Sequence, residues 1–240
     1  MTPDAAVARA IDGAYDAFAP YERPAVLDAA PSRDGAAILR TLSAAPLRHL
    51  SGEQIGPYSG WAITTVGSEE DYKHFLPRIL EQAVRDPAWM GTDPAVIAQR
   101  LARAEWRTWP RTERDAVCGL YWAAWEQARQ SHPDETSASD WLCGLGALGE
   151  DIGKALAQWL SPPSAHAALQ VAQLTIAMNE QLSGEEPQDS WSYVTDRRTV
   201  LDWLASDGVR ATLSDIAHAV APQDVWQIDA ALAVHRRATH

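Results

Sequence analysis

The sequence has few cysteines, few phenylalanines and few basic residues. Its 240 residues include two cysteines, Cys118 and Cys143, and two phenylalanines. Two cysteines are too few for a disulfide framework or for a zinc site with cysteine ligands. We therefore expect each one to be a buried, inert thiol in a reducing compartment.

Long apolar runs are also missing. No stretch approaches the ~20 apolar residues that a membrane-spanning helix needs. The N-terminal segment carries an acid, Asp4, where a secretory leader carries basic residues. These features predict a soluble, cytoplasmic protein that does not bind a membrane.

Acidic residues outnumber basic ones by a wide margin. Lys and Arg total 20 and Asp and Glu total 32, which gives a formal net charge of −12. Proteins that bind nucleic acid neutralise phosphates with basic side chains, so this balance argues against a nucleic-acid partner. The acids form no long run, and we expect them on a solvated surface. A basic protein is the kind of partner that this charge favours.

Tryptophan, alanine and leucine are the abundant apolar residues. The chain holds 11 tryptophans, and it has few of the β-branched residues that favour strands. Strong helix formers dominate instead, so the sequence predicts an all-α fold. Only residues 61–66 resemble a strand, and flanking helices could absorb them.

Helix-start signals recur along the first half of the chain. Apolar residues at helical spacing predict a first helix over about residues 3–18. Ser51 with Gln54 three residues later resembles a capping box, and Ser68 is followed by three acids that the helix dipole favours in a first turn, so helix starts are predicted at both serines. Pro77 lies inside the second of these helices and is expected to kink or split it.

The pattern continues to the C-terminus. Thr92 or Asp93 before Pro94 predicts one helix, and Pro110 opens another that pairs with it as a hairpin. Residues 183–190 form a turn-rich interruption. Later helix starts are predicted at Ser137 or Ser139, Glu150, Pro163, Thr195, Asp207 and Pro222.

Two regions are expected from this pattern. Residues 1–32 hold the N-terminal helix and an irregular linker over 20–31, and residues 33–240 form a single helical domain. Antiparallel helix pairs stacked in an irregular, solenoid-like array fit the sequence, and so does one compact helical domain.

One glycine motif invites a nucleotide-binding interpretation. Residues 144–149 have the spacing G-x-G-x-x-G of dinucleotide-binding loops. That motif follows a strand and precedes an acid by about 20 residues. Here a helical pattern precedes it, and Leu169 and Gln170 occupy the later position. We predict no nucleotide site, and no cofactor is expected.

Two Asp–His pairs have a spacing that is used in helical metal sites. Asp71 precedes His74, and Asp215 precedes His218, by three residues. With 7 His and 32 acids in 240 residues, about one such pair is expected by chance. We expect surface side-chain pairing and predict no metal site.

Aromatic residues concentrate in the predicted hairpin. Two of them, Trp122 and Trp125, lie three residues apart on one predicted helix and could line a groove for a ligand or a partner helix. The other interpretation makes these indoles the packed core of the hairpin. The candidate ligand- or partner-binding residues are His74, Arg78, Trp106, Trp109, Trp122 and Trp125.

Two segments carry a family resemblance. Residues 62–67 end in T-T-V-G and are followed over 71–81 by D-Y-K-H-F-L-P-R-I-L-E, and residues 106–114 read W-R-T-W-P-R-T-E-R. These blocks resemble a family of bacterial hypothetical proteins that has no assigned function. The likeness covers roughly residues 47–125, about a third of the chain.

The resemblance implies no catalytic role and no metal. Members of that family often carry cysteines after a Tyr-x-Arg-Pro segment, which is residues 21–24 in this chain. Residues 29–32 read A-A-P-S instead, so a metal site based on those cysteines does not carry over.

The sequence contains no complete catalytic constellation. The leading hypothesis is a non-enzymatic, acidic, all-helical protein that binds a protein partner and neutralises a basic one. The alternative is an enzyme or a small-molecule-binding protein with a pocket near residues 106–125. A helical subunit of a homo-oligomer is a third possibility.

Overall fold

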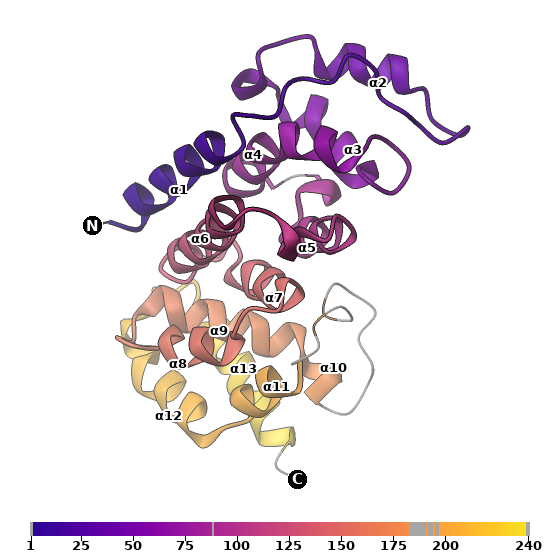
Figure 1. Cartoon of the computed structure of the whole chain (residues 1–240). Helices are drawn as coiled ribbons and strands as arrows, with labels where there is room; N and C mark the ends of the chain where they lie inside the picture. The colour runs from indigo at the N-terminus through magenta and orange to yellow at the C-terminus, as the bar shows by residue number, and fades with distance from the viewer. Residues whose placement is uncertain (1, 88, 183–190, 192–193, 195–196, 239–240) are drawn as a thin grey trace. The chain divides into compact units, whose positions relative to one another are not determined.

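The computed structural model describes residues 2–87, 89–182, 191, 194 and 197–238 (Figure 1). All regular elements in these ranges are helices, which confirms the predicted all-α class. Residues 61–66, the strand-like run, form the end of a helix and a turn. There Val66 makes isolated bridges to Ala29 and Ala62 and belongs to no strand.

Residue contacts divide the chain into two units, residues 1–124 and residues 125–240. This division differs from the expected boundary at residue 32, because the expected linker is packed against its neighbours. Leu27 is buried. The Ala30 N–H donates to the Thr65 carbonyl at 2.8 Å, and the Gly67 N–H donates to the Asp28 carbonyl at 2.7 Å.

The first unit contains helices α1 to α5 and most of α6, which crosses the division. Helix α4 packs against α1 and α3, and α3 also contacts α2 and α5. The helices are α1 (Pro3–Ala17), α2 (Gly35–Leu42), α3 (Gly52–Trp61), α4 (Glu69–Arg85), α5 (Pro94–Arg103) and α6 (Arg111–Ala128), with short 3₁₀ turns η1 (Leu47–His49), η2 (Met90–Thr92) and η3 (Trp106–Thr108).

The predicted helix starts of this unit are confirmed. Ser51 and Ser68 both form capping boxes, with Gln54 and Asp71 as their partners. At α5 the cap is Asp93, whose carboxylate accepts from two backbone N–H groups. Helix α4 continues as one helix through Pro77, which excludes the predicted split.

The second unit packs its helices around α9. Helix α13 and helix α12 lie against α9, and α11 lies against α8. The expected turn-rich segment 183–190 and the start at Thr195 lie outside the described residues. The elements are α7 (Ala138–Leu148), α8 (Ile152–Trp159), α9 (Ala165–Ala177), α10 (Asn179–Leu182), α11 (Arg197–Leu204), α12 (Asp207–Ile216), η5 (Ala217–Ala219) and α13 (Val225–Ala238).

The glycine motif lies within helix α7 and at its end. Gly144 and Gly146 are helical residues, and Gly149 is the C-cap in the left-handed conformation at φ 73°. This is the usual role of glycine after a helix. The motif does not form the strand-to-helix loop that would approach a pyrophosphate.

Indole rings form the core of the second unit. Trp125 meets Trp159 edge-on at 6.2 Å between ring centroids, and Trp203 stacks on Trp159 at 5.6 Å. The buried Arg129 guanidinium lies 5.6 Å from the Trp125 ring and forms two hydrogen bonds of 2.6 Å with the Glu126 carboxylate. Its charge is therefore paired within the core.

We predict that Ser68→Ala lowers the free energy of unfolding by about 1 kcal/mol, because the cap of α4 is lost. Chemical denaturation monitored by circular dichroism measures the change. Ser214→Ala is the matched control, since Ser214 is exposed in the last turns of α12. An unchanged stability of Ser68→Ala would contradict the capping role.

Candidate functional site

The six residues predicted as a site do not form one cluster, and each lies among its own packing or hydrogen-bonding contacts. Trp106 and Trp109 are buried on and beside η3, and Trp109 Nε1 donates to the Ala104 carbonyl at 3.0 Å. Trp122 is half-buried on α6. Trp125 is buried in the second unit, against Trp159. Three of these four indoles are therefore buried, but Trp125 packs in the second unit and not in the predicted hairpin.

His74 and Arg78 lie on successive turns of α4. The His74 Nδ1 lies 2.9 Å from the Tyr21 carbonyl, which requires that Nδ1 carry the proton. Its Nε2 is buried and has no hydrogen-bond partner among the described residues. Burial lowers the pKa of His74, and the nearby Arg23 charge lowers it further against the opposing effect of the Tyr21 hydrogen bond.

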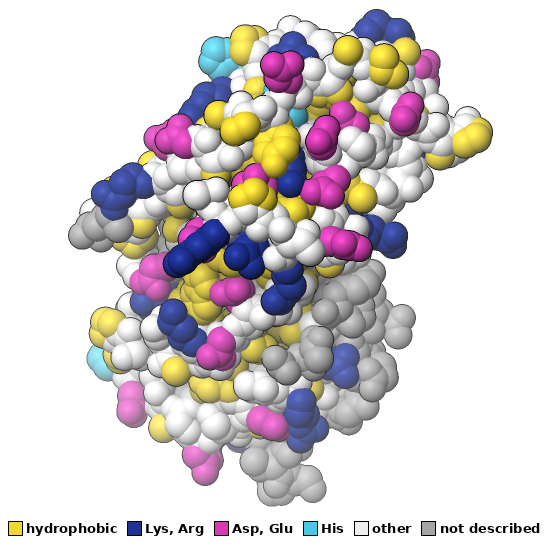
Figure 2. All heavy atoms as spheres, viewed as in Figure 1, with side chains coloured by type: hydrophobic (Ala, Val, Ile, Leu, Met, Phe, Trp, Pro, Cys, Tyr) yellow, Lys and Arg dark blue, Asp and Glu magenta, His cyan; other side chains and the backbone are white. Residues whose placement is uncertain are grey.

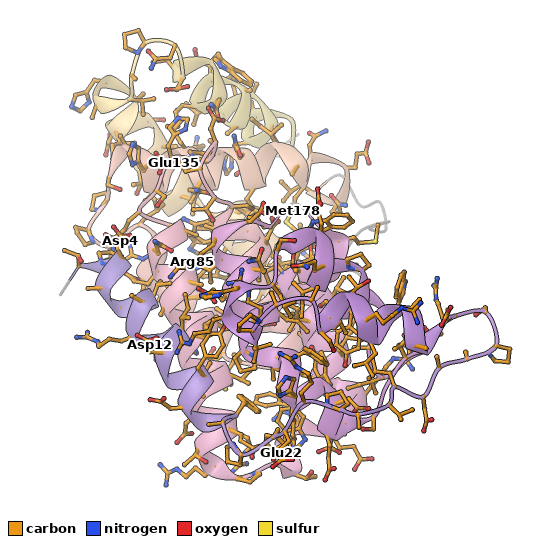
Figure 3. The ribbon with its side chains drawn as sticks, turned by 90° about the horizontal axis from the view of Figure 1, so that it is seen from above. Asp4, Asp12, Glu22, Arg85, Glu135 and Met178 are labelled. Atoms are coloured by element: carbon orange, nitrogen blue, oxygen red, sulfur yellow. The ribbon has the colours of Figure 1, made fainter. Side chains whose placement is uncertain are left out.

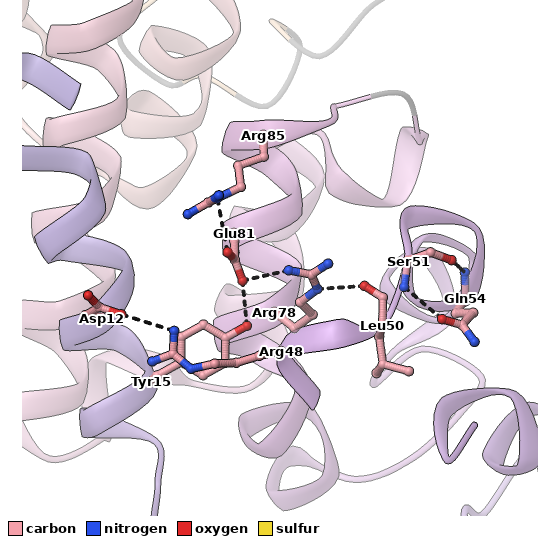
Figure 4. Close-up of polar contacts among 9 residues, drawn as sticks. All are labelled: Asp12, Tyr15, Arg48, Leu50, Ser51, Gln54, Arg78, Glu81 and Arg85. Atoms are coloured by element: carbon pink, nitrogen blue, oxygen red, sulfur yellow. Dashed lines mark hydrogen bonds and ion pairs between the residues drawn. The ribbon is translucent and has the colours of Figure 1, made fainter. Parts of the chain in front are cut away.

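Arg78 belongs to a network centred on the buried Glu81 carboxylate (Figure 4). The carboxylate accepts hydrogen bonds of 2.7 Å from Arg78 Nη1 and from the Tyr15 hydroxyl, and Arg85 Nε lies 3.0 Å away. Arg78 Nε donates to the Leu50 carbonyl at 2.7 Å. Burial and the Glu81 carboxylate raise the pKa of Tyr15. The network joins α1 to α4.

A second buried network lies around Lys73 on α4. Lys73 Nζ lies 3.2 Å from the buried Glu113 carboxylate of α6 and 2.9 Å from Glu69. The Tyr21 hydroxyl donates to Glu113 at 2.7 Å and accepts from Lys73 at 3.2 Å. Burial alone lowers the pKa of Lys73, but the bonds to Glu69, Tyr21 and Glu113 outweigh it and raise that pKa.

Aromatic rings enclose this ion pair. Lys73 Nζ lies 4.2 Å from the centre of the Trp109 ring, a distance at which the cation attracts the ring face. Phe18 meets Trp109 edge-on at 5.9 Å. Together with the Tyr21–Glu113 hydrogen bond, these contacts hold the C-terminal end of α1 beside the N-terminal end of α6.

An open groove of about 870 Å³ lies between α1 and α6. Its lining includes none of the six predicted residues. All eleven lining residues are exposed or half-buried. They are Ala6, Ala10, Gly13, Asp16, Ala17 and Pro20 from α1 and the segment after it, and Thr112, Asp115, Ala116, Gly119 and Ala123 from α6.

Both walls of the groove repeat one spacing of small residues. Ala6, Ala10, Gly13 and Ala17 stand 4, 3 and 4 residues apart on α1. Thr112, Ala116, Gly119 and Ala123 repeat that spacing on α6. Positions at these intervals share one face of a helix. Each wall is therefore a row of small side chains.

The charge in the groove is negative. Asp16 and Asp115 line it, and no lysine or arginine does. Asp115 pairs with the exposed Arg111 at 3.3 Å, whereas Asp16 forms no ion pair with any described residue. Asp4 and Asp12 lie nearer the N-terminus of α1 (Figure 3). On the face shown in Figure 2 basic and acidic side chains are interspersed. The residues that line the groove include two acids and no basic residue.

A smaller hollow of about 340 Å³ lies in the second unit, lined by residues 129–130, 162 and 164–166. The Arg129 guanidinium there is already bound by Glu126. His166 Nδ1 lies 3.0 Å from the Gln130 carbonyl, and its ring meets that of His132 at 5.7 Å. These partners leave the hollow without a charged group that could bind a ligand.

The two Asp–His pairs do not form ligand sets. Asp71 accepts from Ser68 as the capping partner of α4. Asp215 and His218 are both exposed. Within the described residues, no group of three or more His, Cys, Asp or Glu is placed to hold a metal ion. No described helix is long and apolar enough to span a bilayer.

Comparison with known proteins adds no relative. No family model, no curated protein and no solved structure matches the chain. The resemblance of residues 47–125 to a family of hypothetical proteins therefore stays an expectation, and the site is argued from its geometry.

We predict that Lys73→Met lowers the free energy of unfolding by about 3 kcal/mol, because Glu113 then keeps a buried charge without its partner. Adding Glu113→Gln removes that charge, so the double variant should be more stable than Lys73→Met alone. Urea denaturation of the single and double variants measures both effects.

The exposed residue Lys154 supplies the control, Lys154→Met, which should change stability little. A double variant that is less stable than Lys73→Met would show that the two side chains are not coupled as a buried pair.

We also predict that acidification destabilises the fold through His74. Its pKa in the folded state lies below the ordinary value of 6.5, so in mildly acidic solution the unfolded chain binds a proton that the folded chain does not. Stability is then complete above pH 6.5 and falls as the pH is lowered. His74→Asn, which retains a donor for the Tyr21 carbonyl, should make this fall shallower.

Denaturation midpoints between pH 7.5 and 5.5 measure the slope. His218→Asn, at an exposed histidine, is the control and should leave it unchanged. Buried His235 has a pKa lowered by burial and by Arg210 and contributes in the same direction, so part of the slope should remain. Equal slopes for His74→Asn and the unmodified protein would contradict the prediction.

Proposed function

We propose that this protein is a non-enzymatic interaction module that binds a basic protein partner in the groove between α1 and α6. One observation carries the proposal: the groove is open, walled by small apolar residues and lined by Asp16 and Asp115 without a basic residue. An open apolar groove of this kind is suited to a protein segment.

The net charge of this chain determines the sign of the charge expected on its partner. The chain carries a formal net charge of −12, so a basic partner is attracted from a distance and a second acidic copy of the chain is repelled. The two aspartates then meet the partner's basic side chains at the groove itself. Attraction between exposed charges is weakened by salt, which gives the proposed complex a measurable signature.

Two helical peptides of opposite charge test the proposal. Both have 18 residues with the same face of Ala and Leu, and the remaining positions are Lys in one peptide and Glu in the other. We expect the lysine peptide to bind, as measured by fluorescence anisotropy, and its affinity to fall as NaCl is raised. The glutamate peptide should not bind.

Charge removal locates the contact. Asp16→Asn with Asp115→Asn should weaken binding of the lysine peptide by about three- to tenfold at low salt. Asp202→Asn with Asp229→Asn is the matched control, because Asp202 is exposed and pairs with Arg198 four residues earlier, as Asp115 does with Arg111. Failure of the lysine peptide to bind, or equal effects of the two double variants, would overturn the proposal.

A further inference from the structure

Two glycines of the groove have no role in the packing of the fold. Gly13 lies in α1 and Gly119 in α6, and a Cβ atom built on either would meet nothing within 4 Å. Neither has the positive φ that favours glycine. Glycine is a poor helix former compared with alanine, so the fold would gain from a larger residue at both positions.

Three other glycines of the first unit have a structural reason. A side chain at Gly35, Gly56 or Gly91 would collide with neighbouring backbone or with Trp89. A Cβ at Gly208, on α12 of the second unit, also meets nothing, but that residue lines neither of the two hollows described above. Gly13 and Gly119 differ from Gly208 in lining the groove.

The two glycines hold equivalent places in their rows. Each is the third residue of a row with the spacing 4, 3 and 4, and each is flanked in its row by alanines. Each row runs over 12 residues, or 11 helical steps, which is about 16 Å at the rise of an α-helix, or roughly three turns. Small residues at such spacing allow the backbone of another helix to approach closely.

We propose that the occupant of the groove is a single α-helix of the basic partner, of about three turns, seated against Gly13 and Gly119. Its apolar side faces the alanine rows, and its Lys or Arg side chains flank that side and reach Asp16 and Asp115. This inference rests on the proposed function and adds the form of the partner and the point of closest contact.

An extended segment fits the same groove less well. Its side chains alternate between opposite faces with a period of two residues, whereas both walls repeat at helical intervals. A second copy of this chain would bring two further aspartates into the groove, where like charges repel. The helix of a basic protein satisfies both the spacing and the charge.

The test fills the groove from its two walls. Gly13→Leu with Gly119→Leu places two side chains in the open space, and Gly208→Leu is the matched control on an exposed helix. We expect the double variant to bind the 18-residue lysine peptide at least about tenfold more weakly and the control to bind it normally. Neither change should lower the melting temperature, because leucine is the better helix former.

Nuclear magnetic resonance supplies a second readout. In the ¹⁵N-labelled protein, the amide signals of Gly13 and Gly119 should shift on addition of the lysine peptide, and that of Gly208 should not. Circular dichroism of the mixture should show a gain of peptide helicity. A lysine peptide with the same composition in scrambled order, without an apolar face, should bind more weakly.

The outcomes separate the two proposals. Binding that depends on Asp16 and Asp115 but is unaffected by the leucines, or that adds no helicity, would overturn the helix in the groove and leave the basic partner standing. Absence of any binding by the lysine peptide would overturn both. Self-association that the leucine variant abolishes, measured by sedimentation, would show that the occupant is a second copy.

Discussion

The buried ion pair between Lys73 and Glu113 is the constraint on which the first unit depends. It joins α4 to α6 across 40 residues of sequence, and its oxygen and nitrogen atoms also hold the Tyr21 hydroxyl. A buried pair of this kind contributes little net stability, but loss of one partner is strongly destabilising. The role of the ion pair is to set the position of the end of α1 relative to α6. That placement creates the groove.

The groove shows how stability and binding oppose each other in this fold. Alanine would strengthen α1 and α6 at the two exposed glycines, yet those glycines leave open space on the two walls of the groove. Natural proteins tolerate such losses where function requires space or flexibility. The same residues that weaken each helix would give the backbone of the proposed partner room to approach.

Local signals in the sequence predicted the elements well. Ser51, Ser68 and Asp93 were recognisable as caps because capping depends on residues within one turn. The site was not predictable in the same way. His74, Arg78 and Trp109 were noticed for their chemistry, but their partners Tyr21, Glu81 and Lys73 are set by tertiary packing. The alanine and glycine rows that line the groove carry no chemical signal, and only the fold shows that they are left uncovered.

The groove exists only while α1 is docked. Helix α1 packs against α4 and is tied to the rest of the first unit through Tyr15, Phe18 and Tyr21. Release of α1 would remove one wall of the groove, so binding in the groove requires the docked helix. A partner that binds only the docked state would stabilise it by mass action, so occupancy of the groove by the proposed partner would add to the contacts that hold the N-terminal helix in place.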